Sequence, residues 1–146
     1  MICLVPISFE NIPDFEDTSY AAMSADDKRR MVQESCDKRH NGAYFEILSV
    51  SDDGQVVGFM NLFAHAEHTI SIGPEIKERF RGQGYGCRGE MLALQYAKQS
   101  GYLSAVANVR EDNAASIALH EKLGFSLEDR CTGKHGCFVR IYRKTL

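Results

Sequence analysis

Arg81-Gly82-Gln83-Gly84-Tyr85-Gly86 connects a predicted strand to a predicted helix. The backbone N–H groups at the start of that helix have no helical acceptors, so several of them point to one place. The helix dipole and the Arg81 guanidinium add positive potential, and the glycines let a ligand approach the main chain without meeting Cβ atoms. The stretch therefore predicts a binding site for an anion such as a diphosphate. A tight turn without a ligand is the alternative, but it requires fewer glycines.

The nearest predicted elements are the strand before this stretch and the helix after it. Thr69 to Ile76 alternates with period two and places three isoleucines on one face. Gly73 and Pro74 interrupt the strand, and because proline has no N–H to donate, they predict a bulge or an exposed edge at which the sheet opens. Gly84 to Gln99 carries an apolar stripe typical of a helix, and Gly101 ends it.

The rest of the chain supplies further strands and helices. The other predicted strands are Ile2–Val5, Tyr44–Val50, Val56–Phe63, Tyr102–Val109, Phe125–Cys131 and Cys137–Arg143. The other predicted helical segments are Asn11–Phe15, Ala25–Lys38 behind a Ser24 cap, and one from Asp112 or Asn113 to Leu123. This order predicts a mixed sheet, antiparallel in its hairpins and parallel where a helix crosses over, with about four flanking helices. We expect a single α+β domain, α/β-like in its crossovers, over residues 1–146.

Length and composition exclude several classes of protein. The 146 residues suffice for one domain, and 44% hydrophobic with 25% charged residues is typical of globular proteins. A formal net charge of -3 supplies no broad positive field, so we expect no nucleic-acid partner. The 5 cysteines show no zinc spacing, so we expect reduced thiols and no metal. We see no signal peptide and no apolar run of about 20 residues, and therefore expect a cytoplasmic protein without membrane contact.

Two other phosphate motifs are consistent with part of the pattern. Gly84, Gly86 and Gly89 have the spacing of the dinucleotide fingerprint, but too few residues follow them for a Rossmann domain. A P-loop would need a Gly-Lys-Ser or Gly-Lys-Thr sequence after the glycines, which is missing. Neither motif explains the stretch.

Two motifs together resemble the GNAT acetyltransferases. Arg81-x-x-Gly84-x-Gly86 is similar to their pyrophosphate loop. The second signature of the family is similar to Asn113-Ala-Ala-Ser116-Ile-Ala-Leu-His120-Glu-Lys-Leu-Gly124-Phe125, and it follows the first at the usual separation. The resemblance implies a single GNAT-type domain that binds acetyl-CoA.

This resemblance implies an N-acetyltransferase that moves the acetyl group of acetyl-CoA directly to a primary amine. It places an acetyl-CoA-binding core at about residues 69–125 and an acceptor-side region at about residues 1–45. The Ile72-Gly73 pair is similar to the branch of ribosomal-protein N-terminal and small-amine acetyltransferases, so the acceptor would be a small-molecule amine or a peptide or protein N-terminus. Family members commonly pair, which leaves a homodimer open.

Two alternative functions stay open beside this one. The first is a sensor or interaction domain that binds acyl-CoA without catalysis, which the departures from the family pattern suggest. The second is a toxin that acetylates aminoacyl-tRNA. It would need a basic groove that the net charge does not indicate.

The resemblance also assigns donor-site roles. The diphosphate would be bound by Arg81, Gly82, Gln83, Gly84, Tyr85 and Gly86. Main-chain N–H groups near Ile76 and Lys77 would polarise the thioester carbonyl, and the pantetheine arm would lie in the opening beside Pro74 like an added strand. Asn113 would bind the arm as well as cap its helix. Ser116 would face the same groove, and a packing role is equally consistent with it.

Catalytic roles are harder to assign. His120 stands where the family often has a tyrosine thought to protonate the departing thiolate. An imidazole with a pKa of about 6.5 is able to serve a thiol with a pKa of about 8.5, so His120 is the predicted general acid, with plain packing as the alternative. Ser71 stands where related sequences often carry glutamate, and Glu67 lies two strand repeats earlier on the same face, so Glu67 acting through a water is the predicted base. His65 and His68 are alternatives to it.

Overall fold

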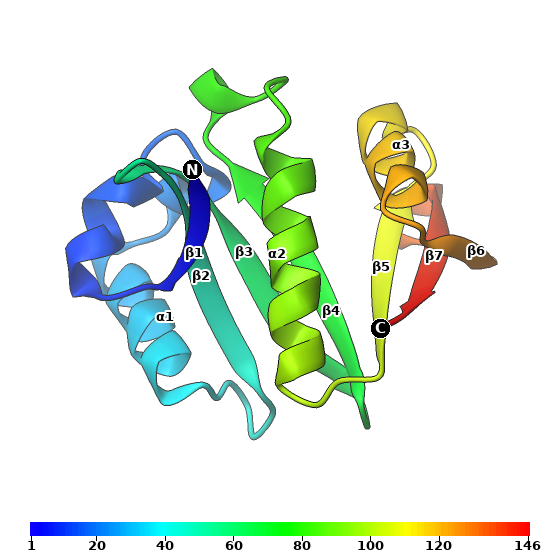
Figure 1. Cartoon of the computed structure of the whole chain (residues 1–146), viewed down its shortest axis with the longest axis horizontal. Coiled ribbons are helices and arrows are strands. Elements are labelled where there is room, and N and C mark those ends of the chain that lie inside the picture. The colour runs from blue at the N-terminus through cyan, green and yellow to red at the C-terminus, as the bar shows by residue number, and fades with distance from the viewer.

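The computed structural model describes residues 1–146 and shows one seven-stranded sheet (Figure 1). The strand order is β1-β2-β3-β4-β5-β7-β6. Only β4 and β5 run parallel, and every other neighbouring pair is antiparallel. The strands are β1 (Ile2–Pro6), β2 (Phe45–Asp52), β3 (Gln55–Ala66), β4 (Thr69–Ile76), β5 (Ser104–Arg110), β6 (Ser126–Thr132) and β7 (Phe138–Thr145). The expected mixed sheet in a single α+β domain is confirmed.

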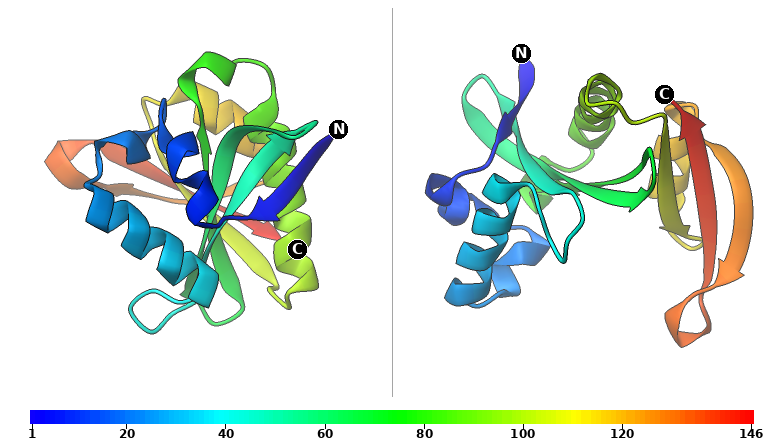
Figure 2. Two further views of the ribbon diagram at one scale, coloured as in Figure 1. Left: turned by 90° about the vertical axis from the view of Figure 1, so that its left-hand side faces the viewer. Right: turned by 90° about the horizontal axis from the view of Figure 1, so that it is seen from below.

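Helical segments cover both faces of this sheet, as the right-hand view of Figure 2 shows. The α-helices are α1 (Ala25–Asp37), α2 (Tyr85–Gln99) and α3 (Ala114–Lys122). The short 3-10 helices are η1 (Phe9–Phe15), η2 (Ser19–Ala22), η3 (Glu78–Phe80) and η4 (Lys134–Gly136). Of the about four helices expected, three are therefore α-helices, and η1 with η2 supplies the remaining helical cover beside α1.

Two hydrophobic clusters form on opposite faces because successive strand residues point to opposite sides. Ile47 of β2 packs in the cluster that contains Val32 of α1. Its neighbour Leu48 packs in the larger cluster, which contains Ala93 of α2. α1 and α2 therefore lie on opposite faces of the same strands.

Gly89 allows α2 to lie close against the sheet. A Cβ atom at this position would lie 2.5 Å from Met60 Cε and 3.2 Å from Val50 Cγ2. Contacts this short do not occur without displacement of the neighbours, so close helix packing accounts for the glycine. Its dinucleotide-like spacing needs no nucleotide to explain it.

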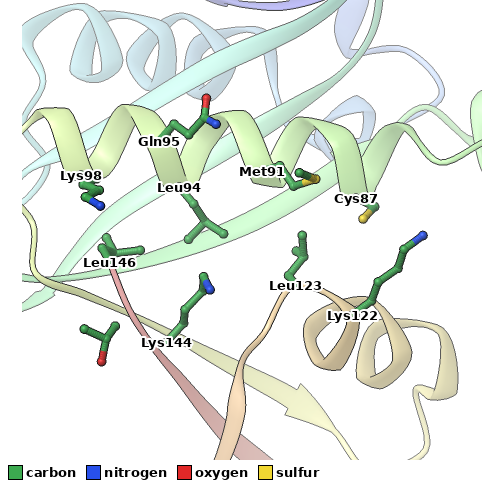
Figure 3. Close-up of a pocket in the computed structure, with 10 residues that line it drawn as sticks. Cys87, Met91, Leu94, Gln95, Lys98, Lys122, Leu123, Lys144 and Leu146 are labelled. Carbon is green, nitrogen blue, oxygen red and sulfur yellow. The ribbon is translucent and has the colours of Figure 1, made fainter.

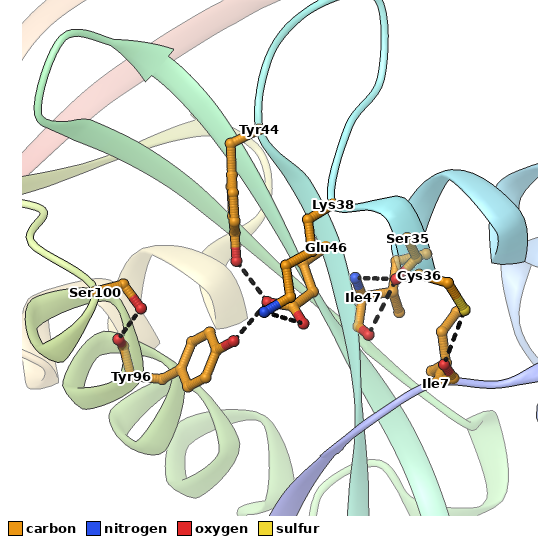
Figure 4. A network of polar contacts seen from close by, with 9 residues as sticks. All are labelled: Ile7, Ser35, Cys36, Lys38, Tyr44, Glu46, Ile47, Tyr96 and Ser100. Atoms are coloured by element: carbon orange, nitrogen blue, oxygen red, sulfur yellow. Dashed lines mark hydrogen bonds and ion pairs between the residues drawn. The ribbon is translucent and has the colours of Figure 1, made fainter.

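A buried carboxylate, that of Glu46, connects β2 to α2 (Figure 4). Glu46 is 1% exposed, yet it accepts hydrogen bonds from the hydroxyls of Tyr44, at 2.6 Å, and Tyr96, at 2.7 Å. Lys38 Nζ lies 3.8 Å from its other oxygen. Burial and the bond to Glu46 raise the pKa of Tyr96 to about 12. Glu46 is thus a charge whose burial is compensated by several partners.

The sheet opens between β4 and β5, which diverge along their length (Figure 1). These strands pair only from Thr69 with Ser104 to Ser71 with Val106. Beyond Ser71, β4 continues to pair with β3 through Gly73 and Pro74 without a shift in register. The register shift lies instead on β3, between Ala64 and Ala66. The predicted opening is confirmed, and on β4 it consists of an exposed edge rather than a bulge.

None of the helices combines the length and the apolar character that crossing a bilayer requires.

Candidate active site

The glycine stretch forms the N-terminal end of α2, where a row of N–H groups lacks acceptors. Gly84 is the N-cap residue and has no side chain to bond to them. No N–H from Gly82 to Cys87 donates to a backbone acceptor. Gly82 and Gly84 have φ angles of 77° and 85°, which side chains disfavour, so the backbone itself requires glycine here. Free N–H groups at a helix start suit an anion.

A groove of about 380 Å³ adjoins these N–H groups, between β4 and the facing ends of α2 and α3. Its lining consists of Pro74, Glu75, Ile76, Phe80, Arg81, Gly82, Gly84, Tyr85, Gly86, Cys87, Ala115 and Leu119. Arg81 is the only basic residue of this lining, and its Nε donates to the Ile76 carbonyl at 3.1 Å. A Cβ at Gly86 would lie 3.5 Å from Leu119 Cδ1, so a larger side chain there would narrow the groove.

Tyr85 fixes the start of α2 against the sheet. Its hydroxyl donates to Asp52 Oδ2 at 2.6 Å, and this hydrogen bond raises the pKa of Tyr85 and lowers that of Asp52. Its ring packs edge-on against Phe80, with the centroids 6.1 Å apart. The Tyr85 wall of the groove is therefore fixed by both a hydrogen bond to Asp52 and a ring contact with Phe80.

The open edge of β4 forms another wall and exposes unpaired main-chain groups. The Lys77 N–H donates to the Val57 carbonyl of β3 at 2.9 Å. Because N–H groups alternate between the two edges of a strand, the Ile76 N–H points to the open side. Of the two predicted positions, Ile76 thus has a free N–H while that of Lys77 is bonded. The Lys77 ammonium is buried and pairs with Asp14 at 3.3 Å.

The polar residues at the start of α3 lie outside the groove lining. Asn113 is the N-cap, and its Oδ1 accepts from the Ser116 N–H at 3.1 Å, which confirms the predicted capping role. Ser116 Oγ lies 3.3 Å from His120 Nδ1. The α3 residues that do face the groove are Ala115 and Leu119. The roles predicted for Asn113 and Ser116 in binding the donor stay predictions.

His120 is buried between α2 and α3 and is not part of the groove lining. Its Nε2 lies 3.1 Å from Oε1 of Glu90, a residue of α2 with 0% exposure. The ring stacks on Tyr142 at 6.3 Å and meets Phe125 edge-on at 5.1 Å. A sealed side chain cannot reach a bound thioester without a movement of its surroundings, so the structure does not bring His120 together with the loop residues.

Glu67 lies in the turn that precedes β4, with a side chain 89% exposed. The glycine stretch follows the other end of β4, and eight strand residues at about 3.3 Å each separate the two ends. We expected Glu67 on the strand face near the chemistry, whereas the structure separates it from the groove by the length of β4.

Glu75 is an acidic residue of the groove lining that sequence analysis missed. Its Oε1 accepts from the Ser19 N–H of η2 at 2.9 Å, which holds the carboxylate between the N-terminal segment and the groove. Strand alternation was the available signal, because Glu75 shares a face of β4 with Ser71 and Gly73. That face of β4 is the one toward η2.

A larger cavity of about 530 Å³ lies between α2, α3 and the end of β7 (Figure 3). Its apolar floor includes Met91 and Leu94, and three lysines that form no ion pair line it: Lys98, Lys122 and Lys144. Cys87 lines both this cavity and the groove, so the two meet at the start of α2. No acidic side chain lines the cavity.

Known proteins of similar sequence and structure are acetyltransferases. The L-methionine sulfoximine/L-methionine sulfone acetyltransferase of Pseudomonas aeruginosa is 30% identical over 89 residues, which are 57% of this chain and 52% of that protein. A chimera of the Vibrio cholerae spermidine N-acetyltransferase superposes with a TM-score of 0.85 at 14% identity, covering 99% of this chain and 94% of that one. A ribosomal L7/L12 alpha-N-protein acetyltransferase in complex with coenzyme A gives 0.82 at 18%, with the same coverage.

The chain spans only 29%, 63% and 52% of the length of the first curated relatives that it matches. A family model described as "Acetyltransferase (GNAT) family" matches residues 9–125, which is most of the chain. The match includes the glycine stretch, the open edge of β4 and the whole of α3. The family expected from two short motifs is confirmed, and the chain belongs to the acetyltransferase (GNAT) family.

Proposed function

We propose that this protein is an acetyl-CoA-dependent N-acetyltransferase. The observation that carries the proposal is the row of N–H groups without backbone acceptors, from Gly82 to Cys87, beside an unpaired strand edge. The N–H groups and Arg81 suit a diphosphate, and the strand edge suits an amide-containing arm. Coenzyme A contains both in sequence, so one ligand would use both features.

Acetyl-CoA supplies an activated acetyl thioester when bound. Arg81 and the start of α2 hold the diphosphate, which fixes the position of the arm along β4. The Ile76 N–H points to the open side of β4 and is the donor suited to the negative charge that develops on the thioester oxygen. Lys77 helps to fix the direction of the Ile76 N–H, because the Lys77 N–H bonds to β3 on the opposite edge and holds β4 in register.

Glu75 is the residue suited to receive the proton of the amine. The acceptor must attack as a neutral amine, whose nitrogen bonds to the acetyl carbon while the bond from that carbon to sulfur breaks. The Glu75 carboxylate lines the groove and has an oxygen not engaged by Ser19. It takes up the amine proton, directly or through a water, and solvent returns a proton to the thiolate. We therefore assign to Glu75 the role that the sequence suggested for Glu67.

A primary amine is the acceptor class that this arrangement supports. The only acidic residue of the lining stands on the acceptor side, where it attracts a cation before the amine loses its proton. Among structural relatives, one acetylates spermidine and another a ribosomal protein N-terminus, as their names state. A small-molecule amine and a peptide N-terminus are thus the two acceptors to test first.

Two measurements on the purified chain test the function. Calorimetry with acetyl-CoA and with CoA should give binding of both, and release of free thiol should then identify acceptors in a panel of polyamines, amino-acid amides and peptides. Binding without turnover on any amine would indicate an acyl-CoA sensor. No binding of either ligand to the folded protein would refute the proposal.

A further inference from the structure

The protein buries two glutamates, and only one of them is well satisfied. Glu46 has two hydroxyl donors and a nearby ammonium, as Figure 4 shows. Glu90 is equally buried, and neither of its oxygens has a hydrogen bond of good geometry. Its single close partner is His120 Nε2 at 3.1 Å. An unsatisfied buried carboxylate is costly, so its presence in the core calls for an explanation.

The hydrogen bonds of His120 determine how many protons the pair holds. Its Nδ1 lies 2.8 Å from the Ser116 carbonyl, an oxygen that only accepts, so Nδ1 carries a hydrogen and donates it. In a neutral ring with this tautomer Nε2 would be an acceptor, facing a carboxylate that is also an acceptor. The contact is attractive only with one more proton, which gives an imidazolium beside a carboxylate. The Glu90–His120 contact therefore depends on that proton.

The position of the pair links it to the groove. α2 packs on the part of the sheet formed by β1 to β4, and α3 packs beside β5 across the opening (Figure 1). Gly86 and Leu119 are the facing positions of the two helices in the groove. Glu90 lies one turn after Gly86, and His120 directly follows Leu119. The pair thus joins the two helices next to the walls between which the donor would bind.

We propose that Glu90 and His120 are positioning residues that hold α3 against α2 and thereby set the width of the donor groove. This inference rests on the proposed function, because it concerns the affinity for acetyl-CoA. It gives His120 a role in which the side chain stays buried, in place of the general-acid role suggested by its place in the family signature. Loss of the contact would let α3 move away and weaken donor binding without removing a reacting group.

The contact should fail as pH rises. Burial lowers the pKa of His120, but the close contact with Glu90, the charge of Glu90 and the hydrogen bond to the Ser116 carbonyl together raise it more, and the net pKa lies above the ordinary 6.5. For a raised pKa, the stabilisation is complete below about 6.5 and is lost as pH rises through the folded pKa. The other polar groups around the ring are the carbonyl and the hydroxyl of Ser116, and Tyr142. The Tyr142 hydroxyl donates to Glu121 and accepts from Arg140.

Glu90→Gln is the most informative variant. The glutamine amide is able to donate to a neutral His120, so the contact would survive without the extra proton. At pH 6 the Glu90→Gln protein should have a dissociation constant for acetyl-CoA close to that of the wild type. This constant should not change between pH 6 and pH 9. The wild-type constant should rise over that range by roughly 5- to 150-fold, the usual size of coupling between sites.

His120→Phe tests the same contact from the other side, with Glu90→Leu/His120→Phe as its matched apolar pair. The single variant leaves a buried carboxylate without a partner, so we expect a raised KM for acetyl-CoA at every pH. The double variant should restore part of the affinity. In both, kcat at saturating donor should be retained, because no reacting group has been removed.

Three results would overturn the inference. The first is a Glu90→Gln protein whose donor affinity has the wild-type pH dependence. The second is a wild-type affinity that does not change with pH. The third is a His120→Phe protein with unchanged KM and lost kcat, which would place His120 in the chemistry. If the His120→Phe protein does not fold, the pH dependence of acetyl-CoA affinity in the Glu90→Gln protein tests the inference by itself. Absence of acetyl-CoA binding by the wild type would instead refute the proposed function itself.

Discussion

Arg81 contributes the only full positive charge of the groove lining. Replacing it with alanine should weaken acetyl-CoA binding, because a hydrogen bond to a charged group contributes about 1.5–3 kcal/mol, or roughly 10- to 150-fold in affinity. Calorimetry should show this loss with little change in thermal stability, since the side chain is exposed. Arg79→Ala is the matched control, because that arginine stacks on Phe80 and does not line the groove. Equal losses in both variants would contradict a specific role for Arg81.

Glu75 and Glu67 are competing candidates for the base. If Glu75 takes the amine proton, Glu75→Gln should lower kcat/KM by roughly 10²- to 10⁴-fold at neutral pH while leaving the dissociation constant for CoA unchanged. Glu67→Gln should behave as the wild type, because its side chain lies at the far end of β4. Steady-state kinetics with one accepted amine measures both. The opposite ranking would return the role to Glu67.

Some site residues could be predicted from the sequence and others could not. The free N–H groups of the glycine stretch were predictable because they are a property of the main chain at a helix start, which glycines mark in the sequence. Ile76 was proposed, together with Lys77, through the family resemblance. Strand alternation was a signal for Glu75 that we did not use. His120 was different, because the direction in which its side chain points depends on the packing of distant elements. No local pattern indicates that position 90 places a carboxylate against position 120.

At the scale of single elements, β4 depends on a glycine of the neighbouring strand. A Cβ at Gly58 of β3 would lie 2.6 Å from the Glu75 carbonyl oxygen and 2.8 Å from Ile76 Cα. Both are backbone atoms of the groove wall, so Gly58→Ala must displace β4. We expect a loss of about 1–3 kcal/mol in unfolding free energy, together with weaker donor binding.

Gly73→Ala is the control for this change, because a Cβ at Gly73 would meet nothing within 4 Å. Urea unfolding of both variants should separate them, with the alanine at position 73 close to the wild type. A Gly58→Ala protein as stable as the wild type would show that β4 adjusts without cost. The backbone contact across the two strands would then not determine the shape of the wall.

Elements were more predictable than their ends or their partners. The helix behind Ser24 and the one behind Asn113 begin where the caps predicted, since a cap is a local hydrogen bond. Gly73 and Pro74 correctly indicated a change in pairing, but a missing N–H is consistent with a bulge or with an unpaired edge. The register of β3 with β4 rules out the bulge. The edge is left open because the pairing of β4 with β5 ends at Ser71, and those two strands lie far apart in the sequence.

For the whole molecule, donor binding should raise the stability of the fold. A ligand that binds only the native state adds about 2.7 kcal/mol at 100 times its dissociation constant. For a domain of this size that corresponds to a rise in Tm of roughly 5–10 °C. Thermal scans with increasing acetyl-CoA should show the shift, and equimolar adenosine, which has no diphosphate, is the control. A shift of the same size with adenosine would argue against recognition of the diphosphate.

The unpaired segment of β4 also bears on self-association. A strand with free N–H and C=O groups is normally a place where another polypeptide adds a strand, which leads to aggregation. Here the unpaired segment of β4 lies inside the sheet, between β3 and the diverging β5. The gap between β4 and β5 closes at Ser71, where the two strands begin to pair. A strand of another polypeptide would have to enter the gap between β4 and β5 from its open end, and the gap becomes too narrow for it toward Ser71. The unpaired N–H and C=O groups of β4 therefore stay accessible to a narrow, extended ligand, while the edge strand of another copy of the protein cannot pair with them.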